Sequence, residues 1–113
     1  KGYLSNCVCD GTISVNSGIM LAVGGIYGNS GSATNPGEIV YLDECSFGGI
    51  INYKNSSATV NDSARIGGII GDLSRGAELN NCLSSGEINV NMNSLAFANS
   101  ANRGIGGIIG NKK

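Results

Sequence analysis

Three copies of one pattern constrain the fold of this chain more than any other feature. The segments LSNCVCDGTISV, LDECSFGGIINY and LNNCLSSGEINV begin at residues 4, 42 and 79. Each reads L-x-x-C-x-x-x-G-x-I, and the cysteine recurs after 38 and then 37 residues. A glycine box of the form GGI-x-G follows each copy. Two linked motifs that recur in register indicate repeated structural units.

Both the period and the local pattern favour β-strands. A period in the thirties, with short runs broken by glycine and asparagine, is typical of a solenoid. Helical repeats need long stretches of 3.6-residue periodicity, and this sequence has none. After each motif glycine, alternate residues face opposite ways. One face carries Ile13/Val15, Ile51/Tyr53 and Ile88/Val90, and the other carries Thr12/Ser14, Ile50/Asn52 and Glu87/Asn89. This period of two predicts a strand.

We predict an all-β fold with three strands in each repeat. The first strands are expected at 3–8, 39–47 and 77–84, the second at 12–15, 50–54 and 87–91, and the third at 19–27, 65–70 and 104–109. Stacked in order, they form a parallel β-helix, or β-solenoid, of about three coils, right-handed as parallel β connections usually are. The repeats, 1–38, 39–75 and 76–113, form one domain. We expect this domain to be a fragment of a longer chain, because it begins with Lys1 rather than Met.

Stacking predicts three inward ladders of like residues. Equivalent strands in such a fold lie about 4.8 Å apart, so each motif residue lies over its copy in the next coil. The expected ladders are Leu4, Leu42 and Leu79; Cys7, Cys45 and Cys82; and Ile13, Ile51 and Ile88.

The stacked cysteines favour a ladder of reduced thiols over a disulfide, although neighbouring coils bring Cα atoms within bridging range. We expect Cys45 to be buried and unbridged. Cys9 has no counterpart and is expected to face the core or a corner.

The glycine boxes raise the alternative of a phosphate site. A dinucleotide-binding loop needs G-x-G-x-x-G before a helix, and a P-loop needs a Lys followed by Ser or Thr. In GIGGIIG (104–110) the third required glycine is Ile109, and no box is followed by Lys-Ser or Lys-Thr. We therefore predict that the glycines serve close packing or a tight bend.

The composition argues against catalysis and against several partner classes. The chain has no histidine, which removes imidazole acid–base chemistry and imidazole metal sites. Its net charge of −1 gives no attraction for nucleic acid, and no apolar run is long enough to insert in a membrane. We predict no enzyme activity, no cofactor and no metal. The adjacent acids Asp43 and Glu44 are expected at a solvated corner. Arg65 and Arg103 fall at equivalent places, just before two glycine boxes. Solvated charges that protect the sheet are favoured there over a two-rung basic ladder.

Two insertions are the best candidates for a binding surface. Residues 55–64 and 92–102 both leave the end of the second strand, so they should lie side by side. In the second insertion Met92, Leu95, Phe97 and Asn99 combine apolar and amide contacts. The alternative is that this loop covers an open coil edge. The ligand, a protein or a glycan, is not identified.

The motifs resemble the GLUG repeat of bacterial surface proteins. The resemblance rests on NCVCDGTISV, NCLSSGEINV and the three GGI-x-G boxes, and spans nearly the whole chain. It departs at Glu44, where the pattern has Asn. Such repeats occur in secreted or cell-surface proteins, including adhesin-like chains and IgA-cleaving metallopeptidases whose metal site lies elsewhere. The chain has no H-E-x-x-H, so the resemblance transfers no catalytic residue.

The expected function is that of a non-enzymatic solenoid module, outside the cell or on its surface, acting as a stalk, spacer or adhesive unit. One alternative is a carbohydrate-binding or carbohydrate-cleaving β-helix. Another is an accessory segment of a large surface metallopeptidase. Because a solenoid without caps exposes unpaired backbone groups at both ends, we also expect end-to-end self-association.

Overall fold

The computed structural model describes residues 2–16, 21–29, 39–55, 64–74, 76–92 and 104–112. Every regular element in these segments is a β-strand. Within these segments, no apolar helix reaches the length needed to span a membrane.

The strands fall into three coils of five. Coil one contains β1 (Gly2–Ser5), β2 (Val8–Cys9), β3 (Thr12–Asn16), β4 (Leu21–Gly24) and β5 (Tyr27–Asn29). Coil two contains β6 (Ile39–Asp43), β7 (Ser46–Phe47), β8 (Ile50–Asn55), β9 (Ala64–Gly67) and β10 (Ile70–Leu73). Coil three contains β11 (Gly76–Asn80), β12 (Leu83–Ser84), β13 (Glu87–Met92), β14 (Gly104–Gly106) and β15 (Ile109–Lys112).

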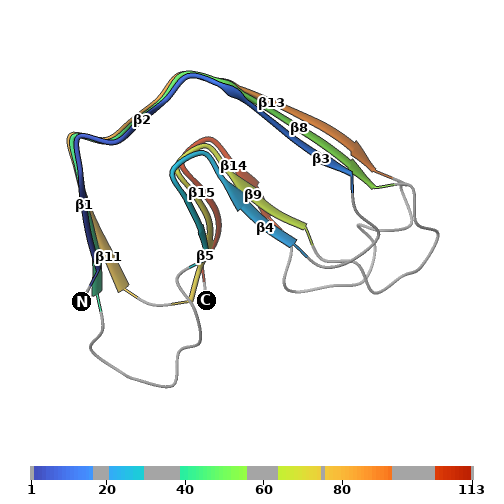
Figure 1. Cartoon of the computed structure of the whole chain (residues 1–113). Helices are drawn as coiled ribbons and strands as arrows, with labels where there is room; N and C mark the ends of the chain where they lie inside the picture. The colour runs from blue at the N-terminus through green and yellow to red at the C-terminus, as the bar shows by residue number, and fades with distance from the viewer. Residues whose placement is uncertain are drawn as a thin grey trace.

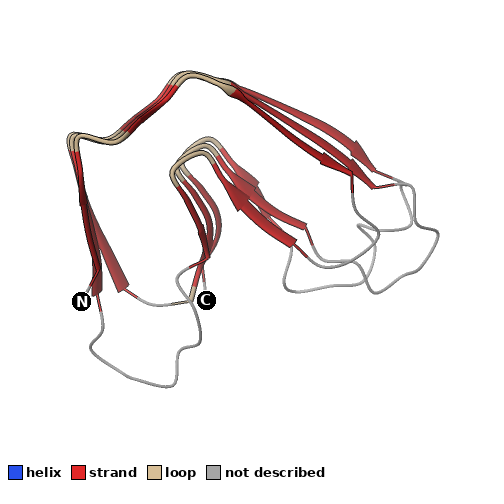
Figure 2. Ribbon diagram, viewed as in Figure 1, coloured by secondary structure: helices blue, strands red, loops and turns tan. Residues whose placement is uncertain are grey.

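Each coil traces two nested arches (Figure 1). Its first three strands form an outer arch, and its last two fold back beneath that arch as an inner one. Equivalent strands pair in parallel, which gives five three-stranded sheets with coil two in the middle. Figure 2 shows the three coils following nearly the same path. The predicted three-coil parallel β-helix is confirmed.

The predicted number of strands per coil is wrong, because two of the three expected strands are broken by corners. The first is interrupted where Asn6, Glu44 and Asn81 adopt left-handed backbone, with φ of 53°, 52° and 52°. The third is interrupted at the glycine pair of each box. Glu44 keeps the corner that asparagine forms in the other coils, so the substitution does not shift the register of coil two.

The leucine and isoleucine ladders lie in the predicted register. Leu4 and Leu79 both pair with Leu42, and Ile13 and Ile88 both pair with Ile51. Leu42 and Ile51 are fully buried, whereas their partners in the outer coils are only partly buried. The core is therefore deepest in coil two, where each apolar residue has a neighbour on both sides.

The glycine boxes serve close packing, as predicted. A Cβ atom on Gly67, the first glycine of its pair, would collide with the carbonyl oxygen of Ile70 across the inner arch. A Cβ atom on Gly25, a second glycine, would collide with the ring of Phe47 in the outer arch. The first glycine thus lets the inner arch close on itself, and the second lets it approach the outer arch.

Replacing Glu44 by asparagine should stabilise the protein. A non-glycine residue in the left-handed region is strained, and asparagine tolerates this region better than glutamate. We expect the free energy of unfolding, measured by urea denaturation, to rise by about 1 kcal/mol. Glu78→Asn removes the same charge from an exposed site on β11 and should have a much smaller effect. Equal effects of the two substitutions would contradict this account of the corner.

Candidate functional site

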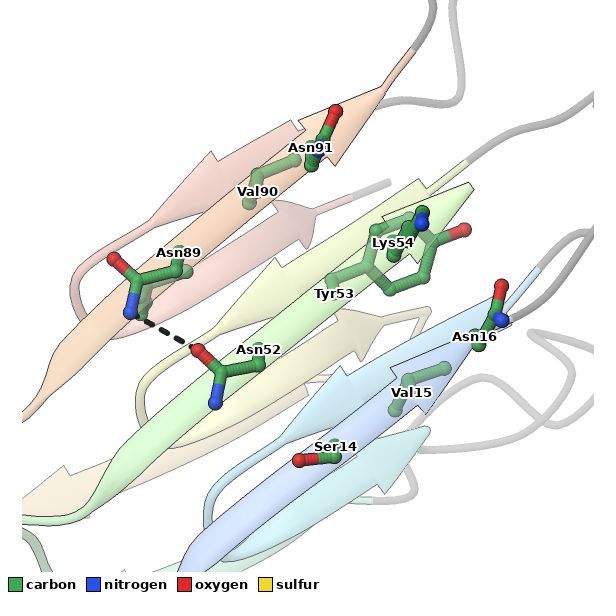
Figure 3. A pocket seen from close by; sticks show the side chains of 10 residues that line it. Ser14, Val15, Asn16, Asn52, Tyr53, Lys54, Asn89, Val90 and Asn91 are labelled. Atoms are coloured by element: carbon green, nitrogen blue, oxygen red, sulfur yellow. Dashed lines mark hydrogen bonds between the residues drawn. The ribbon is translucent and has the colours of Figure 1, made fainter. Parts of the chain in front are cut away.

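A cleft of about 550 Å³ lies along the sheet formed by β3, β8 and β13. Its lining comes from all three coils (Figure 3). The residues are Ser14, Val15, Asn16, Asn52, Tyr53, Lys54, Ile88, Asn89, Val90 and Asn91. Because strand side chains alternate, Tyr53 points to the core, while Asn52 and Lys54 are exposed on the other side of the sheet.

The exposed side of this sheet carries two polar rows, which together we call the amide face. Ser14, Asn52 and Asn89 form the first row, and Asn16, Lys54 and Asn91 form the second. All six residues are exposed. Since parallel strands stack in register, each row repeats every 4.8 Å or so across the coils.

A hydrogen bond between side chains fixes part of the first row. The Asn89 amide Nδ2 donates to Asn52 Oδ1 at 3.0 Å and to Glu87 Oε1 at 2.7 Å. Such ladders of like amides hold neighbouring side chains parallel. The remaining donors and acceptors of these amides are directed to a surface where a ligand can reach them.

The chemistry of the amide face suits a neutral polar ligand. Asparagine side chains both donate and accept hydrogen bonds. Lys54 is the only ionisable group other than Tyr53 among the residues that line the cleft, and none of them is a carboxylate. Glycoside hydrolysis ordinarily uses a pair of carboxyl groups, which the residues lining this cleft do not supply.

The predicted binding loop begins beside the cleft. Met92 is the last residue of β13 and pairs with Asn55, the last residue of β8, so the two insertions leave the sheet side by side. Leu95, Phe97 and Asn99 lie outside the described residues, and the side chain of Met92 is not described. Whether this loop binds a partner stays a prediction.

The amide face itself was not identified as a site from the sequence. The alternation of residues had placed Ser14, Asn52 and Asn89 together on one face. A usable signal was present, because asparagine occupies the position in two of the three coils in each row.

The four cysteines are free in the structure, and Cys45 is fully buried, as predicted. The Cys45 thiol donates to the carbonyl oxygens of Asp43 and Leu4, at 3.5 and 3.7 Å. Partial desolvation raises the pKa of the Cys7 thiol, and the adjacent Cys45 adds to this shift. A raised pKa disfavours the reactive thiolate, which suits a structural role. Cys9 packs against the core in register with Phe47.

The predicted solvation of Arg65 is wrong, because Arg65 and Asp72 form a buried ion pair. Arg65 Nη1 lies 2.5 Å from Asp72 Oδ2, and their side chains are 8% and 1% exposed. The register pairs Arg65 with Ala22 and Gly104, so Arg65 and Arg103 are not equivalent. The small neighbours leave room for the long side chain of Arg65. Arg103 lies outside the described residues.

The two adjacent acids lie at the corner after β6: Asp43 ends the strand, and Glu44 forms the corner. Glu44 is exposed, and Asp43 ends β6 in a partly buried position. Within the part of the chain that the structure describes, no three His, Cys, Asp or Glu side chains gather as metal ligands would.

No family model, curated protein or solved structure matches the chain. The resemblance to the GLUG repeat therefore rests on the sequence pattern alone.

Asp72→Asn should destabilise the protein. The substitution leaves the Arg65 charge buried without its carboxylate, and breaking a buried pair costs about 3 kcal/mol or more. Combining it with Arg65→Ala reproduces Ala22 and Asn29 of coil one and should recover a large part of the loss. Thermal and urea unfolding would measure both variants. Wild-type stability in the single variant would contradict a structural role for the pair.

Thiol labelling tests the reduced ladder. After denaturation without reductant, we expect four reactive thiols in each chain. In the native protein Cys45 should react far more slowly than Cys7 and Cys82, which are only partly buried. Mass spectrometry of labelled peptides would identify each site. Fewer than four thiols after denaturation would indicate a disulfide.

Proposed function

We propose that the chain is a non-enzymatic β-solenoid module of a bacterial secreted or cell-surface protein, and that its amide face is an adhesive surface for a glycan. The observation that carries this proposal is the amide face of β3, β8 and β13, whose exposed residues lie in register from coil to coil. The secreted or surface location is supported by the resemblance to GLUG repeats.

Hydrogen-bonding chemistry favours a glycan as the ligand. Sugar hydroxyl groups, like serine hydroxyls, both donate and accept, and they match amide side chains that do the same. A strongly ionic ligand would need more charge than Lys54 supplies. The rows run across the coils, so an extended saccharide lying along the stack would meet equivalent amides at successive coils.

The same architecture supports a stalk or spacer role. Each coil uses 37 or 38 residues to add one rung, and the rungs keep their register through all three coils. Solenoids of this kind gain stability from the contact of each repeat with its neighbours. A module that lengthens by rungs can carry the amide face away from its anchor.

Removing two stacked amides should abolish most glycan binding. The wild-type protein would first be screened on an array of neutral and acidic oligosaccharides, and its affinity for a bound saccharide measured by calorimetry. Because each lost hydrogen bond costs about 1 kcal/mol, the double substitution Asn52→Ala and Asn89→Ala should weaken binding by roughly tenfold or more.

Asn80→Ala is the matched control. Asn80 is also an exposed strand asparagine, but it lies on β11, in a different sheet. This variant should bind as the wild type does. The proposal fails if the array shows no bound saccharide, or if the folded double variant binds with unchanged affinity.

A further inference from the structure

Glycine is required where the coils touch in the outer arch. Gly11, Gly49 and Gly86 occupy one row at the start of the second long strand. A Cβ atom on Gly49 would collide with the carbonyl oxygen of Gly11, and one on Gly86 with that of Gly49. Each glycine in this row thus makes room for the preceding coil.

A second row has the same requirement in the opposite direction. Gly25, Gly68 and Gly107 lie at the bend of the inner arch. A Cβ atom on Gly25 would collide with the carbonyl oxygen of Gly68, and one on Gly68 with that of Gly107. Each glycine here makes room for the following coil.

The end members of the two rows are glycines that the described chain does not itself require. Within the described residues, a Cβ atom on Gly11 or on Gly107 would meet nothing within 4 Å. Neither residue has the left-handed backbone that would by itself favour glycine. If each row keeps its direction, a Cβ atom on Gly11 would project beyond the coil-one edge of the stack. One on Gly107 would project beyond the coil-three edge.

We propose that these two edges dock on each other, so that two copies of the chain stack head to tail. Continuing the outer row places Gly11 against the carbonyl oxygen of Gly86 of the second copy. Continuing the inner row places Gly107 of that second copy against the carbonyl oxygen of Gly25. Both otherwise unexplained glycines therefore face the same junction.

The backbone hydrogen bonds extend in the same way. The Ile50 amide donates to Gly11 O at 3.0 Å, and the Glu87 amide donates to Gly49 O at 2.9 Å. The next bond in this series joins the Thr12 amide of one copy to Gly86 O of the other. The junction therefore repeats the coil-to-coil contact already present twice within the chain.

Apolar burial favours the same contact. Ile105 and Ile108 in coil three are 46% and 44% exposed. Their counterparts in coil two, Ile66 and Ile69, are fully buried beneath coil three. A coil docked on the coil-three edge would cover Ile105 and Ile108, and burial of this apolar surface drives association.

The test is sedimentation velocity over a wide concentration range. The wild-type protein should form a concentration-dependent series of oligomers, because a head-to-tail contact that does not close continues from copy to copy. Gly11→Ala and Gly107→Ala should each weaken association roughly tenfold or more, since a methyl group would overpack the junction. Circular dichroism and urea unfolding of the monomer should show no loss of stability.

Gly2→Ala is the matched control in coil one. A Cβ atom on Gly2 also meets nothing within 4 Å, but its row continues with Val40 and Ala77, which carry side chains. Stacking therefore tolerates a Cβ atom in this row, and Gly2→Ala should associate as strongly as the wild type. Gly49→Ala, inside the stack, should instead destabilise the fold.

A mixing experiment identifies the edges that meet. The Gly11→Ala protein keeps an intact coil-three edge, and the Gly107→Ala protein keeps an intact coil-one edge. Mixed together, they should form a one-to-one dimer that does not elongate, although each alone stays monomeric at that concentration. A strictly monomeric wild type, undiminished association of the glycine variants, or no dimer in the mixture would each overturn the proposal.

Discussion

The in-register contact between coils is the constraint on which the whole structure depends. At a rung spacing of about 4.8 Å, each position must accommodate its own copies above and below. Where the row lies against backbone, as at Gly49 and Gly68, only glycine fits. Where it lies in the core, one leucine or isoleucine stacks on the next, and Leu42 and Ile51 lose all contact with solvent. The repeated pattern in the sequence is the direct result of this rule.

The exceptions to the rule show what the rows allow. Arg65 lies in a row with Ala22 and Gly104, and its size is possible because neither neighbour competes for the space. Its charge is compensated by Asp72, which replaces the asparagines at equivalent positions in β5 and β15. Within the described residues, coil two is thus the only coil in which a buried ion pair joins the two strands of the inner arch. It is also the coil most completely shielded from water, where an unpaired charge would cost most.

Much of the fold could be predicted because stacking converts sequence spacing directly into spatial neighbours. The positions of Leu42 and Ile51 followed from the motif alone. A corner was expected at the adjacent acids Asp43 and Glu44. That the same corner breaks the first strand of every coil was not predicted, because left-handed backbone is suggested by Asn6 and Asn81 but concealed by Glu44. The equivalence of Arg65 and Arg103 was assigned from their place before the glycine box, and a shift of one residue was enough to make it wrong. The amide face was missed because its residues are individually ordinary, and their significance depends on a shared row.

Stacking between copies would also change what the amide face can bind. Each added copy would bring three more rungs, and the rows that contain Asn52 and Asn89 would continue across the junction with the same spacing. A short saccharide would gain little, because it already spans the rungs of one copy. An extended glycan would contact several copies at once, and each contact after the first would be intramolecular, with a high effective concentration. The weak hydrogen bonds at single rungs would then sum to strong binding of the glycan. The glycine-lined edges and the amide face would thus act together.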